Sequence, residues 1–413
     1  MAKGFGEASV SLKKSRKSSS AIAAVDCEQV QKQLLSHFED LADPRGKQGV
    51  LHPFTSIMMI ALLATISGAK GWEDIEIYGI SHEIWLSSFL ALPFGIPSAD
   101  TYRRLFEKIS PKAMERSFNS WLSSLAIDLG AQVIPIDGKK VLGSYDCNQE
   151  QSALHLVSAW ASENRLFLGQ VKVEDKSNEI TAIPALLELL NISGCIITID
   201  AMGTQHEIAH RIQALGADYV LALKANHPTL HAQVKQWFEN AQVNDFEGIK
   251  YSNESRVESG HHRREKRQVT AVALNQIEDL YKQTQWFGLQ TIIRVIRTRH
   301  LWNKTTTEVM FYLSSLPPDA QQLGKAIRQH WSIENQLHWV LDVTFGEDAC
   351  RIRTGYAPEN VALLKRWSIN LLNQETSFKR STRQKSRRAS MDEGYLLKVL
   401  MASISSYSNL SDA

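Results

Sequence analysis

The sequence predicts an α/β protein in which a mixed β-sheet is covered by helices, interrupted by a strand-rich insertion and preceded by an all-helical region. Three observations support this fold class. Apolar residues recur at helical spacing before residue 131, and short apolar runs then alternate with helical segments. Two of these runs, "VIPIDG" and "IITIDAMG", each end at an aspartate, Asp137 and Asp200, with a glycine close behind.

The bulk composition limits the classes of protein that fit. A chain of 413 residues exceeds one compact core, so two or three domains are expected. The formal charge of +2 means that a polyanionic partner must be met by local basic patches. The four cysteines are scattered, which favours a reduced cytoplasmic protein over a disulfide framework or a zinc knuckle. No secretory signal is expected, and the longest apolar run, 54–69, is shorter than the ~20 residues of a membrane span.

The first 130 residues divide into a polar tail and a helical region. Residues 1–25 are rich in serine and lysine, so a disordered basic tail is predicted. Residues 26–130 are predicted to form an all-helical N-terminal domain. Its expected helices are 28–43, 54–68 (buried), 72–90, the second half of 92–110, and 111–129.

The remaining chain is predicted to form the sheet and its cover. Residues 131–227 hold three successive strands and then a strand–helix–strand alternation. The expected order is strands 131–143, 153–162 and 165–174, helix 179–192, strand 194–202, helix 204–216 and strand 217–226. Residues 228–318 are interpreted as a strand-rich insertion, 319–375 as returning helices, and 376–413 as a basic, flexible C-terminal tail.

The two aspartates are candidate metal ligands. Ligands gather at the carboxyl ends of strands in α/β sheets, so Asp137 and Asp200 are expected to meet there. Two neighbouring carboxylates repel unless a cation neutralises them, and hard oxygen ligands suit Mg²⁺ or Mn²⁺. The alternative is that each aspartate is only a turn residue at the end of a strand.

A third acid is available on a predicted helix. In "IRQHWSIENQLHW", His330, Glu334 and His338 follow one another at four-residue spacing and so share a face. Glu334 can therefore complete a carboxylate site. Two alternatives are an exposed glutamate hydrogen-bonded to a histidine, and a zinc site made by the two histidines with Glu334.

These motifs together resemble the insertion-sequence DDE transposases, in the branch associated with H-repeats near Rhs elements. The similarity covers about residues 34 to 373 and lies in the order and spacing of several motifs. They are "DPRGKQGVLHPFTSIMMIALLATISGAKGWEDI", "LPFGIPSADTYRRLF", "IDGK", "ITIDAMGTQ", "DYVLALKANH", "GHHRREKR" and "HWSIENQLHWVLDVTFGEDACRIR".

The resemblance implies an RNase H-like catalytic core in two parts, 131–227 and 319–375, with a DNA-associated helical domain before it. It implies that Asp137, Asp200 and Glu334 are both the catalytic and the metal-binding residues, with Mg²⁺ or Mn²⁺ as cofactor. Asp137 would bridge two cations, and the other two acids would each hold one. Water attack would nick the element end, and the freed 3′-hydroxyl would attack target DNA.

One part of the family pattern differs here. Related transposases carry Tyr, Arg and Lys around the glutamate, where this chain has Ile327, His330 and Leu341. Arg328 or His330 is a candidate replacement for the phosphate-contacting arginine. Three nearby acids compete with Glu334 for its role, and they are Asp342, Glu347 and Asp348.

The resemblance also implies DNA as the partner, both as terminal inverted repeats and as target, without a membrane. It implies a homodimer on paired ends and a cytoplasmic, nucleoid-associated location. Candidate DNA-binding residues are Lys139, Lys140, Lys224, His261, His262, Arg263, Arg264, Arg267, Arg328 and His330. The alternative for each is a solvated surface charge. Two alternative functions are a domesticated or inactive DNA-binding protein with the same fold, and a non-specific metal-dependent nuclease.

Overall fold

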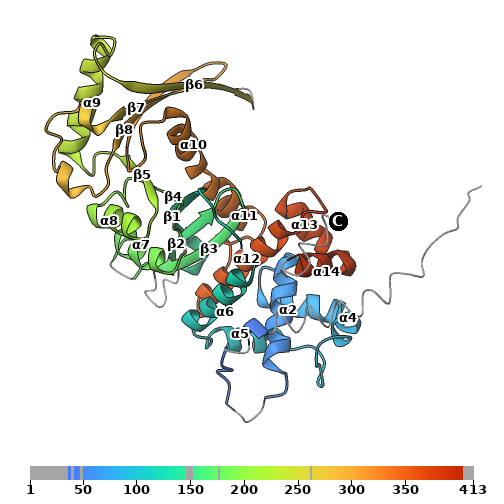
Figure 1. Ribbon diagram of the computed structural model, residues 1–413. Coiled ribbons are helices and arrows are strands. Elements are labelled where there is room, and N and C mark those ends of the chain that lie inside the picture. The colour runs from blue at the N-terminus through green and yellow to red at the C-terminus, as the bar shows by residue number, and fades with distance from the viewer. Residues whose placement is uncertain are drawn as a thin grey trace, which may run out of the picture.

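The computed structural model describes most of the chain, and its elements are labelled in Figure 1. The described residues are 36–38, 41–46, 50–125, 127–145, 152–174, 177–260 and 263–402. The predicted tail 1–25, most of the predicted helix 28–43 and the last residues of the predicted tail 376–413 lie outside them.

Within these residues, one nine-stranded mixed sheet runs in the order β3-β2-β1-β4-β5-β9-β8-β7-β6. β1, β4 and β5 are parallel to one another, and every other neighbouring pair is antiparallel. The strands of the predicted insertion therefore extend the same sheet beyond β5. The strands are β1 (Val133–Val141), β2 (Leu154–Ala161), β3 (Leu166–Lys172), β4 (Ile196–Ile199), β5 (Asp218–Leu223), β6 (Tyr251–Gly260), β7 (Arg263–Ala273), β8 (Thr291–His300) and β9 (Thr305–Ser314).

Helices cover both faces of this sheet. α7 (Glu179–Glu188), α8 (His206–Ala214) and α9 (Pro228–Val243) share an apolar cluster with one face. α10 (Ala320–His330) packs on the opposite face through Leu323 and Ala326. Alternate residues of a strand point to opposite faces, so the sheet separates these two clusters. The opposite face, beneath α10, is the one that carries the acids.

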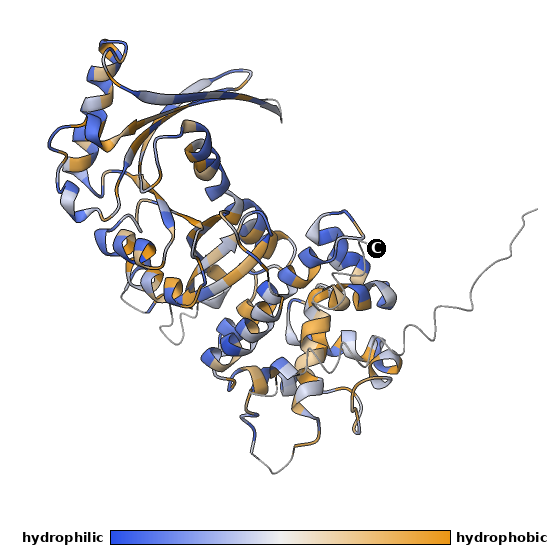
Figure 2. Cartoon of the chain, viewed as in Figure 1, coloured by the Kyte–Doolittle hydropathy of each residue, from blue (hydrophilic) through white to orange (hydrophobic). Residues whose placement is uncertain are grey.

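A helical body adjoins the sheet at the β3 side (Figure 1). Helices from both ends of the described chain share one apolar core there. α2 is apolar on all sides and almost wholly buried, and its hydrophobic colour is visible in Figure 2. The helices are α2 (Phe54–Ile66), α3 (Trp72–Ser81), α4 (Glu83–Ser87), α5 (Ala99–Phe106), α6 (Pro111–Ser124), α12 (Ala357–Gln374), α13 (Thr382–Ala389) and α14 (Glu393–Met401).

The predicted α/β class with a mixed sheet is confirmed, and the chain order of β1 to β5 with α7 and α8 is the predicted one. Every element described before β1 is a helix. These helices share their core with α12 to α14, so this region does not pack as a separate body. Among the described residues, no helix combines the length and the apolar character that a membrane span requires.

Two elements of the insertion, α9 and β6, were not predicted. α9 buries a stripe at helical spacing, Leu230, Val234 and Phe238, which the strand-rich interpretation overlooked. β6 is exposed along nearly its whole length, so it lacks the apolar alternation that predicts strands.

The prediction of a flexible tail after residue 376 was wrong for the segment that forms α13 and α14. Ser381 and Asp392 cap these helices, each accepting a hydrogen bond from a backbone N–H. The basic side chains are used for packing, because the Arg388 guanidinium lies 4.4 Å from the ring centre of Tyr395. Charge composition alone did not reveal this.

Candidate functional site

The sheet places Asp137 on β1 and Asp200 directly after the neighbouring strand β4, on the same face. β1 and β4 pair in parallel up to Ile136 and Ile199, and in both segments the next residue is an aspartate. Thr198, two residues before Asp200, bonds to His330 of α10, and Val133, four residues before Asp137, packs beneath α10. Strand alternation therefore puts both carboxylates on the side that α10 covers.

The apolar run ends at Asp137, but the strand does not. β1 continues to Val141, paired with β2, while β4 stops one residue before Asp200. Asp137 lies beside the carboxyl end of β4, the parallel strand next to β1. The position is partly buried, because the Asp137 side chain is 28% exposed.

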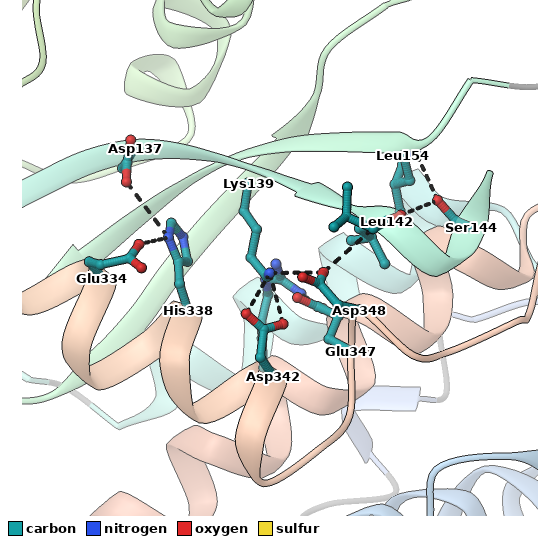
Figure 3. A network of polar contacts seen from close by, with 12 residues as sticks. Asp137, Lys139, Leu142, Ser144, Leu154, Glu334, His338, Asp342, Glu347 and Asp348 are labelled. Atoms are coloured by element: carbon teal, nitrogen blue, oxygen red, sulfur yellow. Dashed lines mark hydrogen bonds and ion pairs between the residues drawn. The ribbon is translucent and has the colours of Figure 1, made fainter.

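The third acid comes from the helix that follows α10. Glu334 begins a π-helical turn, Glu334–His338, which leads into α11 (Trp339–Val343). Such turns carry one extra residue per hydrogen-bonded ring and recur at functional sites. Figure 3 shows Glu334 and His338 facing Asp137. The Nδ1 atom of His338 lies 3.1 Å from Glu334 Oε2 and 3.6 Å from Asp137 Oδ2.

Three donor groups thus converge, and one of them is a histidine. Atoms of Asp137, Glu334 and His338 all lie within 4.8 Å of one another. Asp200 is outside this group, although it lines the same cavity as Asp137 and Glu334. His330 bonds through Nδ1 to Thr198 Oγ1 at 3.0 Å and is also outside it, so the predicted His–Glu–His zinc alternative does not form.

The electrostatics of Asp137 fit a site for a cation. Burial, with smaller contributions from the charges of Glu179 and Asp200, raises the pKa of Asp137 to about 6 against the opposing effect of His338. A buried carboxylate among other acids is stabilised by a positive charge, which a divalent ion supplies. The hydrogen bond from His338 has the opposite effect on Glu334, whose pKa it lowers. Carboxylate oxygens and an imidazole nitrogen are all suitable ligands for such an ion.

The turn that carries Asp200 is held by its own backbone and by the loop after β5. The Asp200 carboxylate accepts a hydrogen bond from the Met202 N–H at 3.0 Å. Asn226 Nδ2 donates to the Ala201 carbonyl at 2.5 Å, and His227 Nε2 lies 2.6 Å from the Thr204 carbonyl. Two side chains of the "KANH" motif therefore fix the turn on which Asp200 sits.

The competing acids have other partners. Asp342 and Asp348 both contact the Lys139 ammonium, at 2.8 and 3.1 Å (Figure 3). Glu347 forms a buried ion pair with Arg366 at 2.5 Å. Glu334 is the acid of this segment that faces Asp137. The same contacts engage Lys139, which is 9% exposed, so a phosphate contact by this lysine would have to break them.

The other predicted DNA-binding residues are spread over several surfaces. Lys140, Lys224 and Arg264 are exposed, and Lys224 lines the cavity beside the acids. Arg328 lies 3.4 Å from Glu258, and Arg267 forms an ion pair with Glu265. His261, His262 and the side chain of Arg263 lie outside the described residues.

A cavity of about 500 Å³ opens beside the acids. Its lining includes Asp137, Asp200 and Glu334, together with apolar residues of β9 and Trp331. Sequence reasoning placed Glu334 in this site but did not assign His338 to it. The available signal was the four-residue spacing between the two, which places them on one face of a helix.

The sequence matches two protein families and is similar to known proteins. Residues 126–371 match the family described as Transposase DDE domain, and residues 35–122 match the family described as DDE_Tnp_1-associated. The chain is 37% identical to "H repeat-associated putative transposase YhhI" of Escherichia coli K12, over 90% of this chain and 98% of that protein. It is also 37% identical to "Putative transposase YncI" of Escherichia coli O157:H7, over 89% of this chain and 94% of that protein.

Among solved structures, the chain is similar to a piggyBac transposase synaptic complex with hairpin DNA, at 10% identity and a TM-score of 0.39. That alignment covers 94% of this chain and 78% of the other.

Proposed function

Because this chain belongs to the family of transposases with a DDE domain, we propose that it nicks DNA at the ends of an insertion element and joins the freed ends to target DNA. The observation that carries the proposal is the convergence of acids. Asp137 on β1 and Asp200, directly after the adjacent strand β4, lie on one face, and Glu334 faces Asp137 from the helix above. This core is assigned as RNase H-like.

Asp137, Asp200 and Glu334 are the proposed catalytic acids and the ligands of Mg²⁺ or Mn²⁺. When bound, two such ions activate the attacking hydroxyl and stabilise the leaving oxygen of a phosphodiester. Asp137 would hold the ions together with either acid, because it lies next to Asp200 in the sheet and faces Glu334. Two sets of contacts hold the acids in place. Asn226 bonds to the turn that carries Asp200, and Lys139 contacts Asp342 in the helix that follows Glu334.

The DNA backbone is proposed to pass over the cavity. Lys224 at its edge is an exposed cation beside the acids. Lys140 on β1 and Arg264 on β7 are also exposed and are proposed as further backbone contacts, although strand alternation turns Lys140 to the face opposite Asp137. Arg328 is paired with Glu258 only at 3.4 Å, at partial exposure, so it remains available for exchange with phosphate. His330 of α10 lines the same cavity, bonds to Thr198 and is also a proposed DNA-binding residue. A homodimer on paired ends and a nucleoid-associated location follow from the same proposal.

The test uses DNA duplexes that carry the inverted repeats flanking the gene, incubated with protein and Mg²⁺. We expect nicks at the repeat ends that leave 3′-hydroxyls, followed by joining to target DNA. Glu334→Gln should bind the ends without nicking them. Specific binding without any cleavage by the natural chain would instead indicate an inactive DNA-binding protein. Cleavage without end preference would indicate a general metal-dependent nuclease.

A further inference from the structure

His338 has the position of a metal ligand rather than of a packing residue. Its side chain is 4% exposed, yet its Nδ1 atom faces the carboxylates of Glu334 and Asp137. Its other nitrogen, Nε2, is buried and makes no hydrogen bond among the described residues. The polar contacts of this nearly buried ring are therefore on its Nδ1 side, toward the two carboxylates.

We propose that His338 Nδ1 is a direct ligand of one of the two cations, together with Asp137 and Glu334. The inference rests on the proposed function, because it assigns a further ligand to the same site. It makes the two cation positions unequal: one has a mixed nitrogen and oxygen donor set, and the other, near Asp200, has oxygen donors. The mixed position binds Mn²⁺ in preference to Mg²⁺.

The distances agree with coordination of one ion. Adjacent ligands of an octahedral ion, each ~2.1 Å from the metal, are ~3.0 Å apart. His338 Nδ1 is 3.1 Å from Glu334 Oε2 and 3.6 Å from Asp137 Oδ2. Donor atoms of all three residues lie within 4.8 Å of one another, so the three side chains are close enough to share one ion after small side-chain adjustments.

The chemistry of the donor set determines the metal preference. Mg²⁺ binds oxygen ligands and keeps much of its water, whereas imidazole is a better ligand for first-row transition metals. Coordination by Nδ1 requires the neutral ring with its proton on Nε2. In the absence of metal, the same Nδ1 position holds the Glu334 carboxylate at 3.1 Å, which keeps two of the three ligands together.

The π-helical turn explains why both ligands reach the ion. Glu334 and His338 are the first and last residues of this turn, and their side chains are directed to the same side (Figure 3). The turn thus presents an oxygen and a nitrogen donor to Asp137 as one unit. Asp200 is held separately, by the Met202 N–H of its own turn.

The experiment is pulsed electron paramagnetic resonance of Mn²⁺ bound to the full chain without DNA. Direct coordination should give nitrogen modulation of the spin echo, and labelling histidine with ¹⁵N should change its frequency. His338→Gln should abolish the modulation and weaken Mn²⁺ binding by about 10-fold or more. His338→Asp, which substitutes an oxygen donor, should also lose it but retain Mg²⁺ binding. His231→Gln is the matched control, because His231 lines the same cavity outside the cluster.

The outcomes separate this inference from the proposed function. Bound Mn²⁺ without nitrogen modulation in the natural chain overturns the assignment of His338, and ¹⁵N labelling decides this even if the variants fail to fold. Asp137→Asn tests the site itself. If Asp137→Asn loses Mn²⁺ while His338→Gln keeps full affinity, only the His338 assignment fails. If the natural chain binds no Mn²⁺, or if Asp137→Asn binds it as tightly as the natural chain, both fail.

Discussion

At the scale of single residues, the site depends on a few carboxylates with opposite electrostatic surroundings. Asp137 is largely enclosed by the sheet, and its pKa is raised to about 6, chiefly by burial. Glu334 is about half exposed, and its hydrogen bond with His338 lowers its pKa. In the free protein, Asp137 therefore binds a proton more readily than an ordinary aspartate, whereas Glu334 ionises more readily than an ordinary glutamate.

Replacing either acid should abolish cleavage and spare DNA binding. Asp137→Asn and Glu334→Gln keep the side-chain shape but remove a charged ligand. We expect the nicking rate to fall more than about 100-fold, since even outer contacts of a metal site are worth 10- to 100-fold. Single-turnover nicking and gel-shift assays on the same duplex measure the two effects.

Asp279→Asn is the control for these substitutions, because Asp279 is exposed and asparagine tolerates its positive φ of 52°. A nicking rate within threefold of the natural chain in either site variant would remove that acid from the catalytic set.

A second residue, Glu115 on α6, should make stability depend on pH. Burial, reinforced by Glu359, raises the pKa of Glu115 from 4.5 to about 7. The folded state thus holds the proton more tightly than the unfolded state. The stabilising effect is complete below about pH 4.5, falls as pH rises, and is lost above about pH 7.

Thermal unfolding of Glu115→Gln beside the natural chain isolates this effect. We expect equal stability near pH 4.5 and a variant more stable by on the order of 2 kcal/mol at pH 8. A difference that does not change with pH would show that Glu115 has an ordinary pKa.

At the scale of elements, ion pairs from β1 hold α11 and the segment after it against the sheet. These contacts position the π-helical turn that carries Glu334. Lys139 on β1 is almost buried and contacts Asp342 of α11 and Asp348. Burial alone would lower the pKa of Lys139, but its hydrogen bonds to these acids outweigh it and raise the pKa. The lysine is therefore charged and engaged.

Lys139→Met should destabilise the fold by roughly 1–3 kcal/mol, because it leaves two partly exposed carboxylates without their partner. DNA affinity and its salt dependence should hardly change, since Lys139 is committed to these acids. Lys140→Met, on the exposed neighbour, should instead reduce the salt dependence of DNA binding. Denaturant unfolding and binding titrations at several salt concentrations distinguish the two. A reduced salt dependence for Lys139→Met would return this lysine to the DNA interface.

The loop after β5 should matter for catalysis without touching DNA. Asn226→Ala removes the bond to the Ala201 carbonyl and loosens the turn that carries Asp200. We expect the nicking rate to fall about 10-fold with DNA affinity unchanged. Asn226→Asp retains the shape but loses the donor, so it should behave like Asn226→Ala. Equal loss of binding and cleavage would mean that Asn226 contacts DNA instead.

Sequence periodicity predicted the strands and helices around the acids because their apolar faces are continuous. β1, β4 and β5 each carry buried residues through most of their length. β6 gave no such signal because nearly all of its side chains are exposed. The four-residue spacing placed His330, Glu334 and His338 on one face, but it did not show that only the last two reach Asp137.

At the scale of the whole molecule, α12 joins the sheet to the helical body. Its Asn370 side chain both donates to the Phe167 carbonyl and accepts from the Phe167 N–H, and so pairs with the edge strand β3. On the other side, the Trp367 ring lies 5.5 Å from Trp121 and 5.1 Å from Phe38. Helices from both ends of the described chain therefore complete one core with α12.

Leu396→Ala should test this shared core from its C-terminal side. Leu396 is fully buried on α14, so we expect a loss of about 2–5 kcal/mol. Because α14 packs with the N-terminal helices, unfolding should remain a single transition shifted to lower denaturant, followed by tryptophan fluorescence and far-ultraviolet circular dichroism. Met391→Ala, at an exposed position, is the control. A separate early transition confined to part of the signal would show that the C-terminal helices fold independently.

The most direct measurement is the anomalous diffraction of Mn²⁺ in crystals of the full chain. We expect a peak within bonding distance of the Asp137 and Glu334 carboxylates, and no such peak in Asp137→Asn. A chain saturated with Mn²⁺ whose peaks all lie away from these two carboxylates would contradict the assignment of the metal site.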